Sequence, residues 1–86
     1  MKWNTDFGCA LAMAFLLRRK KVGIHQRDLA SKMSEKLKLD IKQEQISRWE
    51  SAKTTMPAAI IEVWAEALDT NLINIINNVN ILKELD

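Results

Sequence analysis

Apolar residues recur every three or four positions through most of this chain, the spacing that places them on one side of a helix. The sequence has only two Gly and one Pro, and two of these three stand at predicted boundaries. Gly23 closes the first apolar segment, and Pro57 fits the first turn of the fourth. The connection Asp69–Asn71 separates the last two segments. We expect five helices, at about 5–21, from about 26, 42–51, 57–68 and 71–84.

The composition is that of one small helical domain. The chain has 86 residues, of which 48% are hydrophobic and 28% charged. This length supports one hydrophobic core but not two. The high apolar content and the scarcity of Gly and Pro favour packed helices over disorder or a turn-rich β fold. We therefore expect an all-α fold, with residues 1–86 as a single domain.

The longest apolar run, residues 9–17, does not have the features of a membrane or export segment. It is about half as long as a membrane span requires and ends at Arg18. The basic cluster follows the run, whereas a signal peptide carries its basic residues first. Cys9 is the only cysteine, which excludes an internal disulfide and a thiolate metal cluster. We expect a cytoplasmic protein with no cofactor and no membrane contact.

Charge is distributed unevenly along the chain, although its net value is only +2. Residues 1–57 hold twelve of the thirteen Lys and Arg against six acids, and residues 58–86 hold one Lys against five acids. A basic body with an acidic end suits a polyanion-binding face opposite a partner or solvent face. The alternative is a dipolar surface without a function.

The segment Gln43–Glu50 has the most informative pattern of polar and apolar residues. On a helix, Ile46 and Trp49 share one side, and polar residues occupy the other. Amide, carboxylate, hydroxyl and guanidinium groups on such a face can hydrogen-bond base edges in a DNA major groove. Many surface helices are equally polar, so the neighbouring residues decide what the segment means. The polar residues of this face are Gln43, Glu44, Ser47 and Arg48.

Two segments, LRRKKVGIHQRDLA and QISRWESAKTTMP, resemble the helix-turn-helix domain of lambdoid phage repressors, Cro proteins and XRE-type regulators. The matching region spans roughly residues 15–76. The resemblance implies a five-helix lambda-repressor-like DNA-binding domain, with the helix-turn-helix motif at about 26–51. The chain departs from the family pattern in two places. About six extra residues around Met33–Ile41 imply an extended second helix or turn, and Ala52 stands where the family often has glycine.

The resemblance implies roles for individual residues. Arg19 and Glu50 match a pair that ties the first helix to the end of the third, as a structural brace. The positions that contact bases in the family are matched by Gln43, Glu44 and Arg48. Ser47 lies beside them and is included among the candidate base contacts.

Phosphate contacts form a second group of candidates. The residues expected to make them are Gln26, Lys42, Lys53, Thr54 and Thr55. Ordinary helix capping is the alternative for Gln26, and a solvated basic turn is the alternative for residues 53–55. Within the extra residues, Lys32, Lys36 and Lys38 either add phosphate contacts or form a solvated face.

The last predicted helix, about 71–84, carries more apolar surface than a small domain requires. We expect this surplus to form the interface of a homodimer, made by Ile73, Ile76, Val79 and Leu82. A monomer with a larger core is the alternative.

These observations favour a sequence-specific DNA-binding transcriptional regulator. The expected form is a homodimeric repressor that binds a palindromic operator in double-stranded DNA through the third helix. The alternative is a protein-interaction module, such as an antitoxin or a phage regulatory partner, that binds a toxin or phage regulator through its C-terminal apolar surface. His25 is the only histidine, and no paired-carboxylate, Ser-His or Cys-His pattern occurs, so we expect neither an enzyme nor a metal site.

Overall fold

The computed structural model describes residues 7–54 and 56–84, and the side chains of residues 8–54 and 56–80. This part of the chain forms five helices and no strand, so the expected all-α class is confirmed. The three last helices begin and end within one residue of the predicted bounds. The helices are α1 (Phe7–Val22), α2 (Gln26–Leu37), α3 (Gln43–Glu50), α4 (Ala58–Ala67) and α5 (Leu72–Glu84).

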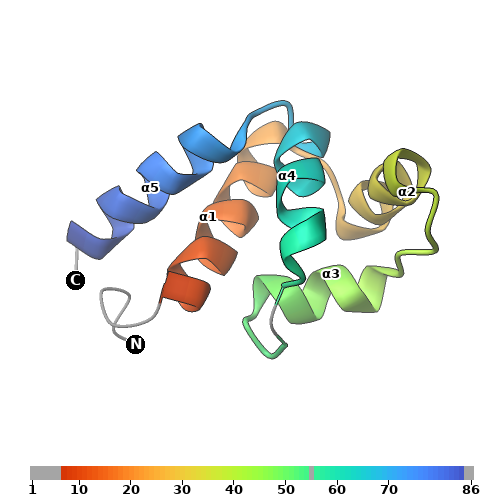
Figure 1. The fold of residues 1–86 in the computed structure, drawn as a ribbon, viewed down its shortest axis with the longest axis horizontal. Helices are drawn as coiled ribbons and strands as arrows, with labels where there is room; N and C mark the ends of the chain where they lie inside the picture. Colours follow the sequence, from red (N-terminus) through yellow and green to blue (C-terminus); the bar gives the residue numbers. More distant parts are fainter. Residues whose placement is uncertain (1–6, 55, 85–86) are drawn as a thin grey trace.

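The helices pack around a small aromatic cluster. α1 and α5 lie side by side, α2 packs on α3 and α4, and α1 also contacts α3 (Figure 1). Phe15 of α1 stacks on Trp64 of α4 with ring centroids 4.4 Å apart, and Trp49 of α3 lies 5.6 Å from Trp64. Such ring pairs add to the free energy gained by burying their area. The cluster therefore fixes α3 relative to α1 and α4.

Gly23 and Pro57 stand at helix boundaries, as the sequence indicates. Gly23 has a φ of 83°, a conformation that costs glycine little, and its N–H donates to Arg19 O at 2.9 Å to end α1. Pro57 lies one residue before α4 rather than in its first turn, and its carbonyl accepts the N–H of Ile60 at 3.1 Å. The predicted start of the first helix at Thr5 lies outside the described residues.

The extra residues between α2 and α3 both lengthen a helix and form an ordered turn. α2 continues to Leu37, and Lys38 ends it in a left-handed conformation with a φ of 55°. The hydroxyl of Ser34 then holds the returning chain, because it accepts the N–H of Ile41 at 2.8 Å and donates to Ala30 O at 2.7 Å. Residues 38–42 thus connect α2 to α3 along a defined path.

Two cationic side chains from other helices bind the carboxyl end of α4. Arg18 Nε donates to Leu68 O at 3.0 Å and its Nη2 to Asp69 O at 2.8 Å. Lys32 Nζ donates to Ala67 O at 2.9 Å. Carbonyls at a helix end lack partners within the helix and carry partial negative charge, so both cations stabilise them. Lys32 is therefore tied to α4 and does not belong to a fully solvated lysine face, whereas a phosphate contact by Lys32 stays a prediction.

Among the described side chains of α5, residues 72–80, only part of the predicted apolar surface faces outward. Ile75 and Val79 lie one turn apart and are fully buried, whereas Ile73 is 71% and Ile76 is 37% exposed. The prediction that Val79 contacts a second copy is wrong, because its side chain belongs to the core of a single chain. The side chain of Leu82 lies outside the described residues.

Candidate nucleic-acid interface

α3 is a short helix whose two large apolar residues point into the core. Ile46 is fully buried and Trp49 is 6% exposed. At the start of the helix, the Gln45 side chain accepts the backbone N–H of Lys42 through Oε1 at 2.9 Å. This contact satisfies a donor that the helix itself cannot pair. The core contacts set which side of α3 faces solvent.

The four predicted base-contacting residues all lie on the exposed side of α3. Their side chains project from successive turns, with carboxylate, amide, hydroxyl and guanidinium groups available at the surface. Gln45 is exposed as well. It was not among the predicted residues, because the spacing of the apolar residues does not show which contacts the Gln45 side chain makes. The exposed polar residues of α3 are Gln43, Glu44, Gln45, Ser47 and Arg48.

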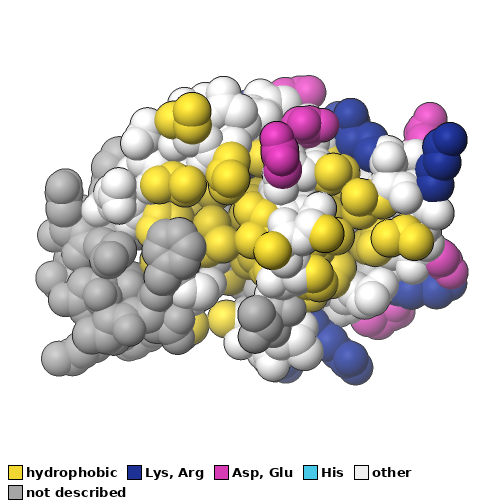
Figure 2. Space-filling view, in the orientation of Figure 1, with side chains coloured by type: hydrophobic (Ala, Val, Ile, Leu, Met, Phe, Trp, Pro, Cys, Tyr) yellow, Lys and Arg dark blue, Asp and Glu magenta, His cyan; other side chains and the backbone are white. Residues whose placement is uncertain are grey.

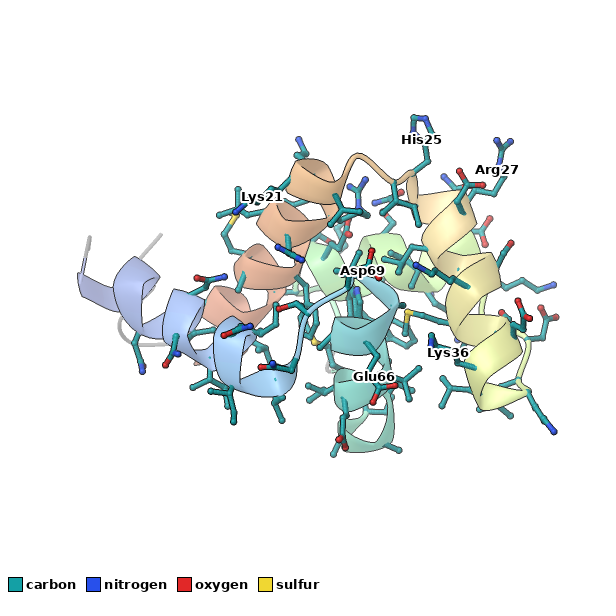
Figure 3. All side chains as sticks on the ribbon, turned by 90° about the horizontal axis from the view of Figure 1, so that it is seen from above. Lys21, His25, Arg27, Lys36, Glu66 and Asp69 are labelled. Carbon is teal, nitrogen blue, oxygen red and sulfur yellow. The ribbon has the colours of Figure 1, made fainter. Side chains whose placement is uncertain are left out.

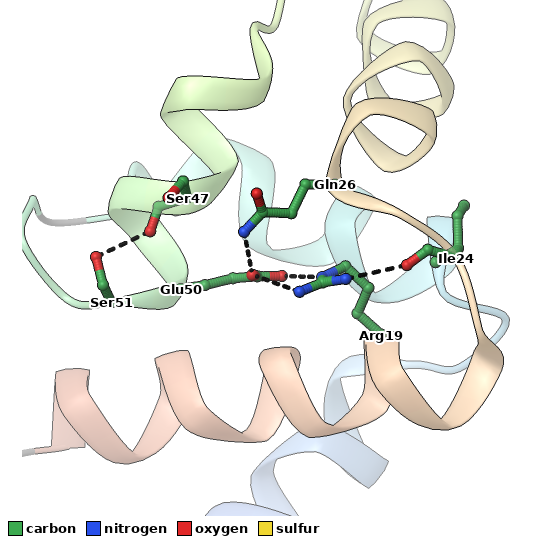
Figure 4. A network of polar contacts seen from close by, with 6 residues as sticks. All are labelled: Arg19, Ile24, Gln26, Ser47, Glu50 and Ser51. Carbon is green, nitrogen blue, oxygen red and sulfur yellow. Dashed lines mark hydrogen bonds and ion pairs between the residues drawn. The ribbon is translucent and has the colours of Figure 1, made fainter.

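Arg19 and Glu50 form a two-point ion pair between α1 and the last residue of α3 (Figure 4). Arg19 Nε donates to Glu50 Oε2 at 2.6 Å and its Nη2 to Oε1 at 3.1 Å. Arg19 Nη1 also donates to the carbonyl of Ile24 at 3.1 Å, just before α2. The side chains are only 12% and 3% exposed. Charge-assisted contacts of this geometry are strong and directional, so they hold α3 at a fixed angle to α1.

Gln26, the first residue of α2, joins the same network. Its Nε2 donates to Glu50 Oε1 at 2.9 Å, so the three helices meet at one carboxylate (Figure 4). The side chain makes no capping bond to its own helix; His25 occupies the cap position and makes none either. The expected contact between Gln26 and a DNA phosphate stays a prediction.

A polar recess opens beside this network, where α2 and α3 begin. It has a volume of about 530 Å³ and is lined by two arginines, a histidine and two amides. The unpaired N–H groups in the first turn of α2 add partial positive charge at its edge. An anion such as a phosphate group suits these surroundings. The lining residues are Arg19, His25, Gln26, Arg27 and Gln43.

Basic side chains gather where α1 ends and α2 begins. In Figure 3, Lys21, His25 and Arg27 lie along one edge, and Glu66 of α4 lies on the opposite edge. Arg27 was not among the predicted site residues, because its position in the first turn of α2 has no distinctive pattern in the sequence.

The loop after α3 contains the other predicted phosphate contacts. Lys53 and Thr54 are exposed, and Thr55 lies outside the described residues. The N–H of Lys53 donates to Arg48 O at 2.9 Å, which fixes the start of the loop. Ala52 has a φ of 58°, in the left-handed region that favours glycine. The loop therefore adopts a glycine-type conformation with alanine in place.

Lys42, just before α3, is engaged by a neighbouring acid. Its Nζ lies 2.8 Å from Asp40 Oδ2. The hydrogen bond and the charge of Asp40 hold the pKa of the Lys42 amine above its usual range. The side chain is exposed and remains charged at neutral pH, but a phosphate contact would compete with Asp40 for it.

Comparisons with known proteins add no relative: no family model, curated protein or solved structure matches this chain. Within residues 7–54 and 56–84, no cluster of three His, Cys, Asp or Glu could hold a metal ion. Nor does any described helix combine the length and apolar character that crossing a bilayer requires.

Proposed function

We propose that this protein is a sequence-specific DNA-binding regulator, a cytoplasmic repressor that binds a palindromic operator as a homodimer. The proposal rests on the exposed polar face of α3, because contacts on the inward side of the helix hold it in a fixed position. Ile46 and Trp49 anchor this helix in the core, and Glu50 ties its end to α1 and α2. A recognition helix needs such support, because small errors in position lose directional hydrogen bonds to bases.

The residues on α3 match the donors and acceptors of the major groove. Arg48 can donate two hydrogen bonds to guanine, and Gln43 can both donate to and accept from adenine. Glu44 can accept from cytosine, or it can orient Arg48 one helical turn further along. Each well-formed pair contributes roughly 1–3 kcal/mol of discrimination between bases.

Groups at both ends of α3 contact the DNA backbone and position it. The recess that contains His25 and Arg27 lies at the start of the helix, and Lys53 and Thr54 lie beyond its end. Phosphate contacts at both ends fix the register of a helix in the groove without reading sequence. Gln26 can reach a phosphate while Arg19 continues to hold Glu50.

Contact between two copies is assigned to the outward side of α5. Ile73 and Ile76 are the exposed apolar residues of this helix among its described side chains. Figure 2 shows hydrophobic side chains spread over the face formed by α4 and its neighbours, with acidic side chains at its upper edge. An apolar area of this kind is a natural two-fold contact, and two-fold pairing matches a palindromic operator.

The proposal is tested by titrating the protein into a fluorescently labelled random-sequence duplex and measuring anisotropy at two salt concentrations. A phosphate-binding interface should lose roughly 10³-fold or more in affinity between 50 and 200 mM salt if it makes six or more phosphate contacts. Arg27→Gln should weaken binding and reduce the salt dependence, whereas Glu66→Gln on the opposite face should change neither. Absence of binding at 50 mM salt would overturn the proposal and favour a protein-interaction module.

A further inference from the structure

α1 carries a second apolar stripe in addition to the one that packs into the core. Ala10, Leu11, Ala14 and Phe15 are buried. Cys9, Met13 and Leu16 lie on another side of the helix, at intervals of four and three residues, and are half-buried. Lys20 continues the same stripe four residues later.

This stripe forms one wall of a groove between α1 and the end of α3. The groove has a volume of about 380 Å³, within the range of small-molecule sites. Its opposite wall is made by Ser47 and Ser51 of the α3 region and by Ala52. The Arg19–Glu50 ion pair and Lys20 lie along its lining. An apolar wall with a few polar groups is the usual character of a ligand site.

The charges in the groove favour an anionic ligand over a cationic one. Among the described residues that line the groove, Glu50 is the only acid, and its two oxygens already accept three N–H donors, two from Arg19 and one from Gln26. Lys20 is exposed, and its amine has no hydrogen bond or ion pair within the described part of the chain. A carboxylate could therefore bind Lys20 without disturbing another contact, whereas an ammonium group would have to compete for Glu50.

We propose that this groove binds a small amphipathic carboxylate. Its apolar chain lies along Met13 and Leu16, and its carboxylate accepts from the amine of Lys20. Removing the apolar chain from water favours binding, and the ion pair at the rim sets the orientation of the ligand.

A regulatory consequence rests on the proposed function. The groove shares Ser47 with the base-reading face of α3, and it shares Glu50 with the network that orients this helix. A molecule bound beside these residues would compete with DNA for the same side of α3. Ligand and DNA then weaken each other's binding by the same factor, as thermodynamic linkage requires.

The direct test uses octanoate, titrated into ¹⁵N-labelled full-length protein without DNA, with octylammonium as the matched control of opposite charge. We expect saturable NMR shifts of backbone amides in residues 9–20 and 47–52, and binding of octylammonium weaker by about tenfold or more. Lys20→Gln should weaken octanoate binding by a similar factor, whereas Lys21→Gln should leave it unchanged. Equal binding of the two probes, shifts confined to α4 and α5, or no saturable shift would each overturn the proposal.

A second measurement separates this site from the proposed function. Octanoate should raise the dissociation constant of a random-sequence duplex for the wild-type protein, and should do so less for Lys20→Gln. If the protein binds octanoate at the groove but binds no DNA, the groove assignment stands and the proposed function fails. If the protein binds DNA but not octanoate, the proposed function stands and the groove assignment fails.

Discussion

Arg19 and Glu50 join α1 to the end of α3 through two N–H···O contacts of 2.6 and 3.1 Å, in surroundings that leave their side chains 12% and 3% exposed. Gln26 adds a third contact to the same carboxylate from α2. Glu50 therefore joins α3 to both α1 and α2, in addition to the core contacts of Ile46 and Trp49. Glu50 lies just before the turn that leads into the loop with Lys53 and Thr54.

Removal of the Glu50 carboxylate should strongly destabilise the fold. Glu50→Ala leaves the Arg19 guanidinium nearly buried and without its acid, and breaking one side of a buried pair typically costs about 3–5 kcal/mol. Urea denaturation followed by circular dichroism measures the change in the free energy of unfolding. Glu44→Ala, on the exposed face of the same helix, is the control and should stay within about 0.5 kcal/mol of wild type. Equal effects of the two substitutions would show that the pair does not hold α3.

Ala52 offers a substitution that should stabilise the protein. A left-handed conformation destabilises the folded state of a residue with a Cβ by about 1–2 kcal/mol. Glycine removes this cost, but it also gives the unfolded chain more conformational freedom, which lowers stability by roughly 0.5–1 kcal/mol. Ala52→Gly should therefore raise the free energy of unfolding by about 0.5–1 kcal/mol and raise Tm by several degrees, measured by thermal denaturation. Ala59→Gly, in the exposed part of α4, should lower it by up to about 1 kcal/mol. A lower Tm for Ala52→Gly would contradict the φ of 58°.

The link from Lys32 to the end of α4 should contribute to stability. Lys32→Met keeps most of the aliphatic side chain and removes the charged donor to Ala67 O, a type of hydrogen bond worth about 1.5–3 kcal/mol. Because Lys32 is only half-buried, water weakens this hydrogen bond. We therefore expect the free energy of unfolding to fall by about 1 kcal/mol, measured by urea denaturation. Lys36→Met, at an exposed position on the same helix, should change stability by less than about 0.5 kcal/mol. The contact is unimportant if the two variants behave alike.

The outward residues of α5 should control association between copies. Ile73→Lys introduces a charge where 71% of the side chain is exposed in the single chain, so the fold should tolerate it while an apolar contact between copies should not. Sedimentation velocity at micromolar concentration should show a shift from dimer to monomer, with an unchanged circular dichroism spectrum. Asn78→Lys, exposed on a different side of α5, tests whether added charge alone has this effect. A wild-type protein that is already monomeric would contradict the dimer assignment.

The helices were predictable because their inward residues follow local spacing. Ile46 and Trp49 lie three positions apart, and one buried side of α3 accounts for both. The same spacing failed for Val79, because α5 is apolar around much of its circumference and the buried side depends on how it packs against α1. Sequence periodicity predicts that such a helix forms, but not which side of it faces the core.

Contacts between distant residues were predictable only where the family resemblance supplied them. The resemblance pairs Arg19 with Glu50, and the structure contains this ion pair. Nothing local indicates that Lys32 reaches the end of α4, 35 residues away. Arg27 was missed for a related reason: its place in the recess results from how the starts of α2 and α3 converge.

Selection from a pool of random duplexes tests most directly whether the exposed face of α3 reads DNA sequence. Wild-type protein should enrich a two-fold symmetric sequence with half-sites about one helical turn apart. Arg48→Ala and Gln43→Ala should each lose preference at particular base pairs, by about 1–3 kcal/mol per position, whereas Lys53→Ala should weaken binding to all sequences alike. Enrichment of no sequence by the wild-type protein, or an unchanged preference in both α3 variants, would contradict the claim.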